Sequence, residues 1–162
     1  MVPILINDIG QWLDQFSEVL DRWESILNDV QTSYMIGNIN RISELCPMGE
    51  AIHVEIQQCK EAREGLLQGA AKLGYRVHSL RDLSVQLDSQ WPAIWTHRLG
   101  KLENQLSRIQ QLSMGLWISA FQSKSYVSEL LLILSTGKSE SATYAPNESH
   151  SLEGGFLINE AA

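Results

Sequence analysis

The sequence has little proline, little cysteine and no long hydrophobic run. It holds four prolines and two cysteines in 162 residues, and its longest wholly aliphatic run is residues 130–134. Cys46 and Cys59 are too few for a disulfide framework and lack the paired spacing of a zinc site, which favours reduced thiols. A run that short cannot span a bilayer, and the N-terminus lacks the basic segment of a secretion signal. We therefore expect a cytoplasmic protein without an integral membrane segment.

Positive charge is also scarce. The chain carries 12 Lys and Arg against 19 Asp and Glu, which gives a net charge of −7. The imbalance is strongest at the start, because residues 1–46 hold two basic and seven acidic side chains. Binding to a phosphate backbone requires a basic stripe, and the sequence contains none. We therefore expect no nucleic-acid partner.

Groups that carry catalysis or bind metals are sparse as well. The four histidines are scattered without the spacing of metal ligands: His53, His78, His97 and His150. Residues 136–139 look like the end of a phosphate-binding loop, but Leu132 stands where that loop requires glycine. No serine, cysteine or carboxylate cluster suggests a nucleophile or an acid/base pair. These patterns favour a binding protein over an enzyme, with no cofactor and no metal site. A phosphotransfer role for His53 is a weaker alternative, because the lysine and glycine expected just after it are missing.

The main positive feature is a proline-free stretch over residues 95–134 with apolar residues at steps of three and four. Ser113, Ala120 and Ser123 fill the gaps in a series that otherwise comprises Trp95, Leu99, Leu102, Leu106, Ile109, Leu116, Val127, Leu130 and Leu134. This spacing predicts one long helix with one apolar stripe. At 1.5 Å per residue the helix would be roughly 60 Å long, more than a compact domain of this size can cover. We infer that part of the stripe is offered to a partner.

The rest of the chain also shows helical spacing. Asn7 or Asp8 is expected to cap a first helix that ends near Cys46. Its predicted core face is Ile9, Trp12, Leu13, Phe16, Leu20, Trp23, Ile26, Leu27, Val30 and Tyr34. Pro47 suits the first turn of a second helix, which Gly74 ends. Within that helix, Gly65 and Gly69 suggest a close approach to another helix.

A short helix follows, and then the composition changes. Ser79 and Asp82 resemble a capping box that opens a helix through Leu87, before Trp91 and Pro92 break it. Residues 138–162 are rich in serine and carry few large apolar groups until the segment Phe156, Leu157 and Ile158. The sequence therefore predicts an all-α fold: an elongated antiparallel helical bundle over residues 1–137, with one long C-terminal helix, and a flexible tail over residues 138–162.

Tryptophans on the apolar stripes are expected to fill the bundle, as with Trp12, Trp23 and Trp95. Trp117 and Phe121 instead flank the stripe of the long helix and widen its apolar arc. Such an arc usually marks a partner site. The predicted contact set for a bound protein is Leu116, Trp117, Phe121, Val127, Leu130, Leu131 and Leu134.

Two groups of residues carry a resemblance to a known family. The first half contains Arg63, Leu66, Leu67, Leu73 and Gly74, and the long helix ends with Ser123, Tyr126, Val127, Leu131, Leu134 and Gly137. The segment Thr143-Tyr144-Ala145-Pro146-Asn147 then follows. Over residues 5–147 this pattern resembles the FlgN-like flagellar export chaperones. The chain departs from the family at Ser113 and Leu116, where many members have asparagines, and at Tyr126, where Phe is usual.

The resemblance implies a cytosolic chaperone for the hook-filament junction proteins of the flagellum, which it delivers to the export gate for type III secretion. It also implies that Thr143 and Tyr144 dock on the cytoplasmic domain of that gate. The residues support the same role, because an apolar helix face can mask the amphipathic terminal helix of an exported subunit. The alternative is a structural or scaffolding coiled coil without cargo, which predicts self-association through the long helix.

Overall fold

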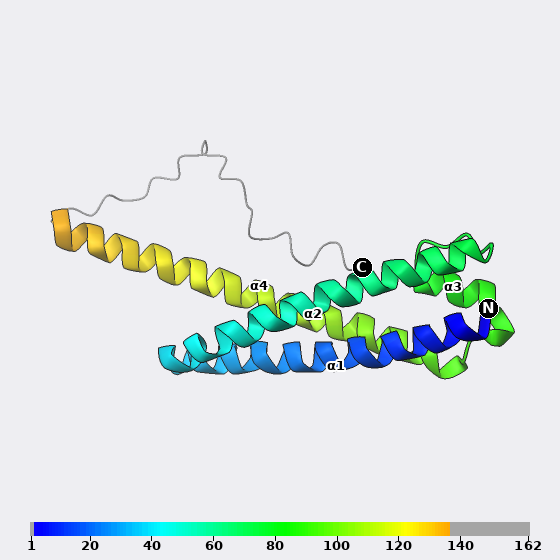
Figure 1. Ribbon diagram of the computed structural model, residues 1–162. Coiled ribbons are helices and arrows are strands. Elements are labelled where there is room, and N and C mark those ends of the chain that lie inside the picture. The colour runs from blue at the N-terminus through cyan, green and yellow to red at the C-terminus, as the bar shows by residue number, and fades with distance from the viewer. Residues whose placement is uncertain (1, 137–162) are drawn as a thin grey trace. The chain divides into compact units, whose positions relative to one another are not determined.

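The computed structural model describes residues 2–136, and these residues are almost entirely helical (Figure 1). The helices are α1 (Val2–Met35), α2 (Ile39–Lys72), α3 (Leu80–Leu87), the short 3-10 helix η1 (Asp88–Gln90) and α4 (Ala93–Thr136). Residues 2–136 contain no strand. The predicted all-α fold with one long C-terminal helix is confirmed. The predicted tail, residues 138–162, lies outside the described residues.

The chain divides into two compact units, residues 1–109 and residues 110–162. The first unit holds α1, α2, α3, η1 and the first part of α4. The described part of the second unit is the remainder of α4, residues 110–136, which we call distal α4.

The first unit is built around an antiparallel hairpin of α1 and α2 (Figure 1). The chain reverses at Gly37, whose φ of +70° suits a residue without a Cβ. Asn38 then caps α2, because its side-chain oxygen accepts a hydrogen bond from the Arg41 backbone N–H at 3.1 Å. The predicted break near Cys46 was therefore wrong, and Pro47 lies inside α2 instead of in its first turn.

The N-terminal boundary of α1 also differs from the prediction. Asn7 and Asp8 lie inside α1 and do not cap it, because the helix already begins at Val2. Pro3 sits in the first turn, where an amide hydrogen has no helical partner and its loss costs nothing. A helix that begins this early adds Leu5 to the buried face of α1.

The predicted core face of α1 is largely confirmed. Buried side chains follow one another at helical spacing along α1: Leu5, Ile9, Trp12, Leu13, Phe16, Val19, Leu20, Ile26 and Leu27. The Trp12 ring stacks on Phe16 at 4.9 Å, and its indole N–H donates to the Cys59 carbonyl at 2.8 Å, which ties α1 to α2. Trp23 is half-buried, whereas Tyr34 is 39% exposed and was wrongly assigned to the core.

Two glycines allow large aromatic rings to approach the helices closely. A Cβ at Gly10 would lie 3.1 Å from the Trp95 ring of α4, and a Cβ at Gly49 would lie 3.3 Å from the Trp23 ring of α1. The close approach predicted at Gly65 and Gly69 was wrong, because nothing lies within 4 Å of a Cβ at either position. The sequence pattern therefore named the wrong glycines.

The short helix α3 begins as predicted. The Ser79 hydroxyl accepts from the Asp82 backbone N–H at 3.0 Å, which satisfies one of the free donors of the first turn. The Asp82 carboxylate reaches back to the His78 N–H at 3.3 Å, one residue before the position that a standard capping box would use. Leu80, Leu83 and Leu87 then bury one face of α3 in the first unit.

Candidate functional site

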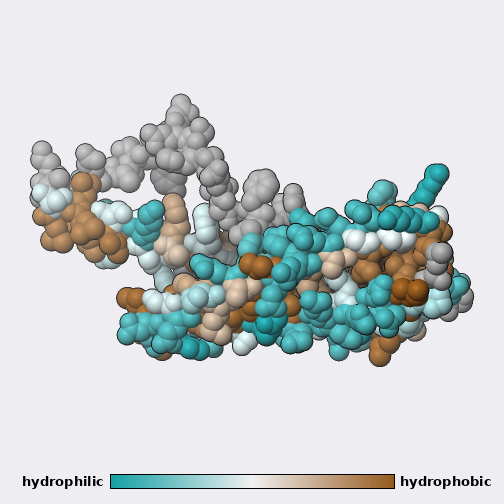
Figure 2. Space-filling view, in the orientation of Figure 1, coloured by the Kyte–Doolittle hydropathy of each residue, from teal (hydrophilic) through white to brown (hydrophobic). Residues whose placement is uncertain are grey.

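Distal α4 is an apolar helix that buries none of its side chains. Lys124 and Glu129 are the only charged residues between positions 110 and 136, and no residue from 110 to 135 is buried. Ten of its large apolar side chains are between 36% and 81% exposed: Met114, Trp117, Ile118, Phe121, Tyr126, Val127, Leu130, Leu131, Ile133 and Leu134. Figure 2 shows hydrophobic surface concentrated over the last turns of α4. A surface of this kind is unusual unless it binds something.

Six of the seven residues predicted to contact a partner are exposed on this helix, and the seventh, Leu116, is half-buried. The Trp117 and Phe121 rings stack on each other with centroids 5.6 Å apart. The prediction missed four exposed apolar residues: Met114, Ile118, Tyr126 and Ile133. Their helical spacing to Phe121 and Leu130 could have identified them. The predicted docking residues Thr143 and Tyr144 lie outside the described residues.

Two serine side chains of distal α4 bond to backbone carbonyls of the preceding turn. The Ser119 hydroxyl donates to the Gly115 carbonyl at 2.9 Å, and the Ser135 hydroxyl donates to the Leu132 carbonyl at 3.1 Å. Bonds of this type run within one turn and bury no apolar area. Most helical stability in proteins comes from the packing of an apolar face. Distal α4 has apolar side chains, but none of them is buried by such packing. It therefore has unused capacity to gain stability from a partner.

A second candidate is a row of polar side chains between α1 and the first part of α4, which we call the polar seam. Arg98 pairs with Asp14, Gln105 bonds Asp21, and Arg108 pairs with Glu24. Each of these three pairs is separated by 84 residues in the sequence. A constant separation means that α1 and α4 run in the same direction, with α2 antiparallel to both (Figure 1).

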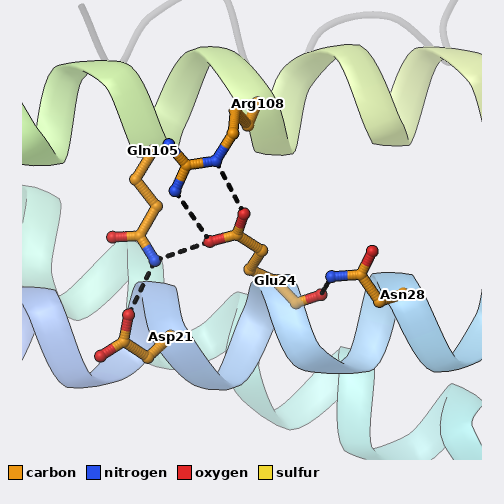
Figure 3. Close-up of polar contacts among 5 residues, drawn as sticks. All are labelled: Asp21, Glu24, Asn28, Gln105 and Arg108. Atoms are coloured by element: carbon orange, nitrogen blue, oxygen red, sulfur yellow. Dashed lines mark hydrogen bonds and ion pairs between the residues drawn. The ribbon is translucent and has the colours of Figure 1, made fainter.

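Glu24 is the centre of this seam (Figure 3). Arg108 donates to its two carboxylate oxygens at 3.0 and 3.4 Å, and the Gln105 amide donates to it at 2.9 Å and to Asp21 at 2.8 Å. The Arg108 hydrogen bonds, supported by the one from Gln105, hold the pKa of the Glu24 carboxyl below its usual range, although burial acts in the opposite direction. Gln105 itself is only 8% exposed. The seam therefore fixes the register of α4 against α1.

The polar seam lines a groove of about 550 Å³, whose walls include Ser17, Lys101, Leu102 and Asn104. Its carboxylates already bind the Arg and Gln side chains that face them, so the groove has no convergent set of groups aimed at a small ligand. Among residues 2–136, no cluster of three His, Cys, Asp or Glu side chains could hold a metal ion. Burial raises the pKa of the Cys59 thiol, which disfavours the reactive thiolate. The contacts of the polar seam join α1 to α4.

Comparison with known proteins identifies no relative. No family model, no curated protein and no solved structure matches this chain. Within the part of the chain that the structure describes, no helix is both long enough and apolar enough to cross a membrane.

Proposed function

We propose that this chain is a cytoplasmic export chaperone that binds an unassembled protein through distal α4 and delivers it to a secretion gate. The observation that carries the proposal is the set of ten exposed apolar side chains on a helix with no core of its own. Such a helix can pack against the amphipathic helix of another protein and bury its apolar face. Catalysis plays no part in this function.

The resemblance to FlgN-like chaperones makes the proposal more specific. The proposed cargo is a hook-filament junction protein of the flagellum, held on distal α4 until type III secretion. A terminal amphipathic helix that aggregates before assembly needs a complementary apolar surface to cover it. Distal α4 offers an apolar surface and carries only two charged residues. Cargo binding therefore prevents premature assembly by covering the surface that polymerises.

Truncation of one exposed leucine tests this proposal. Leu131 is 61% exposed, so Leu131→Ala should leave the fold intact and weaken cargo affinity about thirty-fold, the equivalent of about 2 kcal/mol. Val85→Ala is the matched control, because Val85 is 75% exposed but lies on α3. Calorimetric titration with a purified hook-filament junction protein measures both variants. Equal affinities for the wild type and Leu131→Ala would defeat the proposed cargo site.

Delivery is proposed to depend on Thr143 and Tyr144. A tyrosine combines an apolar ring with one hydroxyl, and it loses few rotatable bonds when it enters a pocket. We expect Tyr144→Ala to weaken binding of the loaded chaperone to the cytoplasmic domain of the export gate without changing cargo affinity. Tyr144→Phe, which retains the ring, separates the contribution of the hydroxyl. Equal gate affinity for wild type and Tyr144→Ala in calorimetry would refute this step.

A scaffolding coiled coil is the second candidate. The three-and-four spacing of the buried Leu102 and Ile109 continues through Leu116 to the exposed Val127, Leu130 and Leu134. A second copy of the chain could cover that stripe. This function predicts a stable dimer without cargo, whereas the chaperone function predicts that cargo competes with self-association. Sedimentation of the chain with and without cargo distinguishes the two.

A further inference from the structure

Eight of the ten exposed large apolar residues of distal α4 form two faces, and the other two, Tyr126 and Ile133, lie in the arc between them. Met114, Trp117, Ile118 and Phe121 make an aromatic face, and Val127, Leu130, Leu131 and Leu134 make a leucine face. With 3.6 residues per turn, each set spans an arc of about 100°, and the two arcs are centred about 140° apart around the helix axis. Their midpoints also lie about 20 Å apart along the axis. One straight partner helix lies along one side of α4 and cannot cover both faces.

Polar residues separate the two faces along the helix axis. Gln122, Ser123, Lys124 and Ser125 occupy the turn between Phe121 and Tyr126. The Lys124 side chain follows Trp117 by seven residues, so it projects on the side of the aromatic face. It is the only cation among residues 110–136. The aromatic face therefore combines an exposed pair of stacked rings with one adjacent positive charge, whereas the leucine face is aliphatic.

We propose that the aromatic face is the docking site of the chain's own segment Phe156-Leu157-Ile158. Within residues 137–162 this segment is the only run of three large apolar side chains. The leucine face then remains for the cargo or another partner. Because the contact is intramolecular, it stands or falls separately from the chaperone function proposed above.

The length of the intervening chain fits this contact. Phe121 and Trp117 lie 15 and 19 residues before the end of α4 at Thr136, which places them about 22 and 28 Å back along the helix. Phe156 follows Thr136 by 20 residues, a span with a maximum reach of about 70 Å. A serine- and glycine-rich sequence of that length has an average end-to-end distance of about 25 Å. The effective concentration of such a tether is highest when its average length matches the distance to be spanned.

The leucine face lies too close to the end of α4 to match this length of connecting chain. Leu131 and Leu134 lie within about 8 Å of the end of α4, far less than the average end-to-end distance of about 25 Å for a sequence of that length.

The distribution of charge also favours the aromatic face. Residues 139–162 contain four carboxylates and no Lys or Arg: Glu140, Glu148, Glu153 and Glu160. Glu153 and Glu160 flank the apolar segment, so either can approach Lys124 when Phe156 meets the stacked rings of Trp117 and Phe121.

Hydrogen exchange of the full-length chain tests the contact from the side of α4. The triple variant Phe156→Ala, Leu157→Ala and Ile158→Ala should accelerate amide exchange in residues 112–124 about threefold, the change expected when the segment covers its face two-thirds of the time. Exchange in residues 126–136 should stay the same. Asn159→Ala is the control, because it retains the apolar segment. Unchanged exchange in residues 112–124 of the triple variant would overturn the proposal.

Nuclear magnetic resonance tests the contact from the side of the segment. In the full-length chain, Trp117→Ala should shift the amide signals of residues 156–158 towards random-coil values, whereas Leu130→Ala should not. Signals that already have random-coil values in the wild type would refute docking. The measurement is repeated at two protein concentrations. A shift that grows with concentration would assign the aromatic face to a second copy of the chain and overturn the intramolecular contact.

Discussion

At the scale of single residues, Gly10 controls how closely Trp95 packs on α1. Alanine is normally better than glycine in a helix by about 1 kcal/mol, because glycine loses more backbone entropy on folding. A Cβ at Gly10 would lie 3.1 Å from the Trp95 ring, and this ring also makes an edge-to-face contact with Trp91 at 5.2 Å between centroids. We therefore expect Gly10→Ala to lose the usual gain and to leave the free energy of unfolding equal to or below that of the wild type.

Gly65→Ala is the control for this substitution. Gly65 is exposed in α2 and nothing lies within 4 Å of its Cβ position, so alanine there should raise the free energy of unfolding by about 1 kcal/mol. Urea denaturation of both variants gives the comparison. If the free energy of unfolding rises as much for Gly10→Ala as for Gly65→Ala, the Trp95 ring moves to make room for the Cβ without loss of stability.

The Glu24 carboxylate makes the stability of the first unit dependent on pH. Its pKa in the folded chain lies below the ordinary value of 4.5, chiefly because Arg108 hydrogen-bonds the charged form. A group with a lowered folded-state pKa stabilises the fold above its unfolded pKa, and this contribution is lost as the pH falls through 4.5 towards the folded pKa. Since the side chain is 23% exposed and its partner is more exposed, the contribution should be modest, about 0.5–1 kcal/mol.

Glu24→Gln isolates this charge while it keeps the shape of the side chain. The variant should be less stable than the wild type at about pH 7, and the difference should shrink as the pH falls through 4.5 towards the folded-state pKa of Glu24. Denaturation curves across this range measure the difference. A difference that stays constant with pH would mean that shape and not charge accounts for the role of Glu24.

Residue periodicity predicted the buried face of α1 well and individual exceptions poorly. Ile9, Leu13 and Leu20 lie within the core because a 3.6-residue period decides which side of a helix faces inward. Tyr34 shares that period but lies near the end of α1, where the hairpin turns and little remains to cover it. The packing of glycines depends on which ring lies opposite, and that information is spread over distant parts of the sequence.

At the scale of helices, α2 tolerates a proline in its interior. Pro47 has no N–H to bond the Ser43 carbonyl, and its ring crowds the preceding turn. Pro47→Ala should therefore raise the free energy of unfolding, by about 1–3 kcal/mol. Thermal denaturation measures the gain. An unchanged or lower melting temperature would show that Pro47 itself is needed for α2 to pack on α1.

The start of α2 shows why its boundary was hard to predict. Proline in a sequence suggests a helix start, and this led to an expected boundary at Pro47. The actual start uses Gly37 for the reversal and the Asn38 side chain for the cap, which together leave Ile39 and Leu45 on α2. Both signals were visible in the sequence, but the apolar spacing of Ile39, Ile42 and Leu45 continued through them. Tertiary pairing of α1 with α2 decided the outcome.

At the scale of the whole chain, the sequence predicted the surface on distal α4 but not its division. A wide apolar arc on a helix too long for its domain was sufficient to single out Trp117 and Leu131, which are exposed in the structure. The original set nevertheless combined residues from the aromatic and leucine faces. The exposed Met114 and Ile118 complete the aromatic face, whereas Tyr126 and Ile133 belong to neither face.

The stability of α4 should change abruptly along its length in the free chain. Leu102, Gln105 and Ile109 are buried in the first unit, whereas no residue from 110 to 135 is buried. Amides held by a packed core exchange only on large-scale unfolding, whereas amides of an unpacked helix exchange by local opening. We expect amides before residue 110 to exchange on the order of a hundredfold more slowly than those after it, because about 2.7 kcal/mol of difference in opening free energy suffices for that ratio.

Hydrogen exchange read by mass spectrometry, at two chain concentrations, measures this gradient. Uniform slow exchange to residue 136 at both concentrations would contradict it, because distal α4 would then be packed in the free chain. Slow exchange only at the higher concentration would instead indicate self-association through the exposed stripe. If cargo binds the leucine face as proposed, its addition should slow exchange in residues 126–136 without a comparable effect before residue 110.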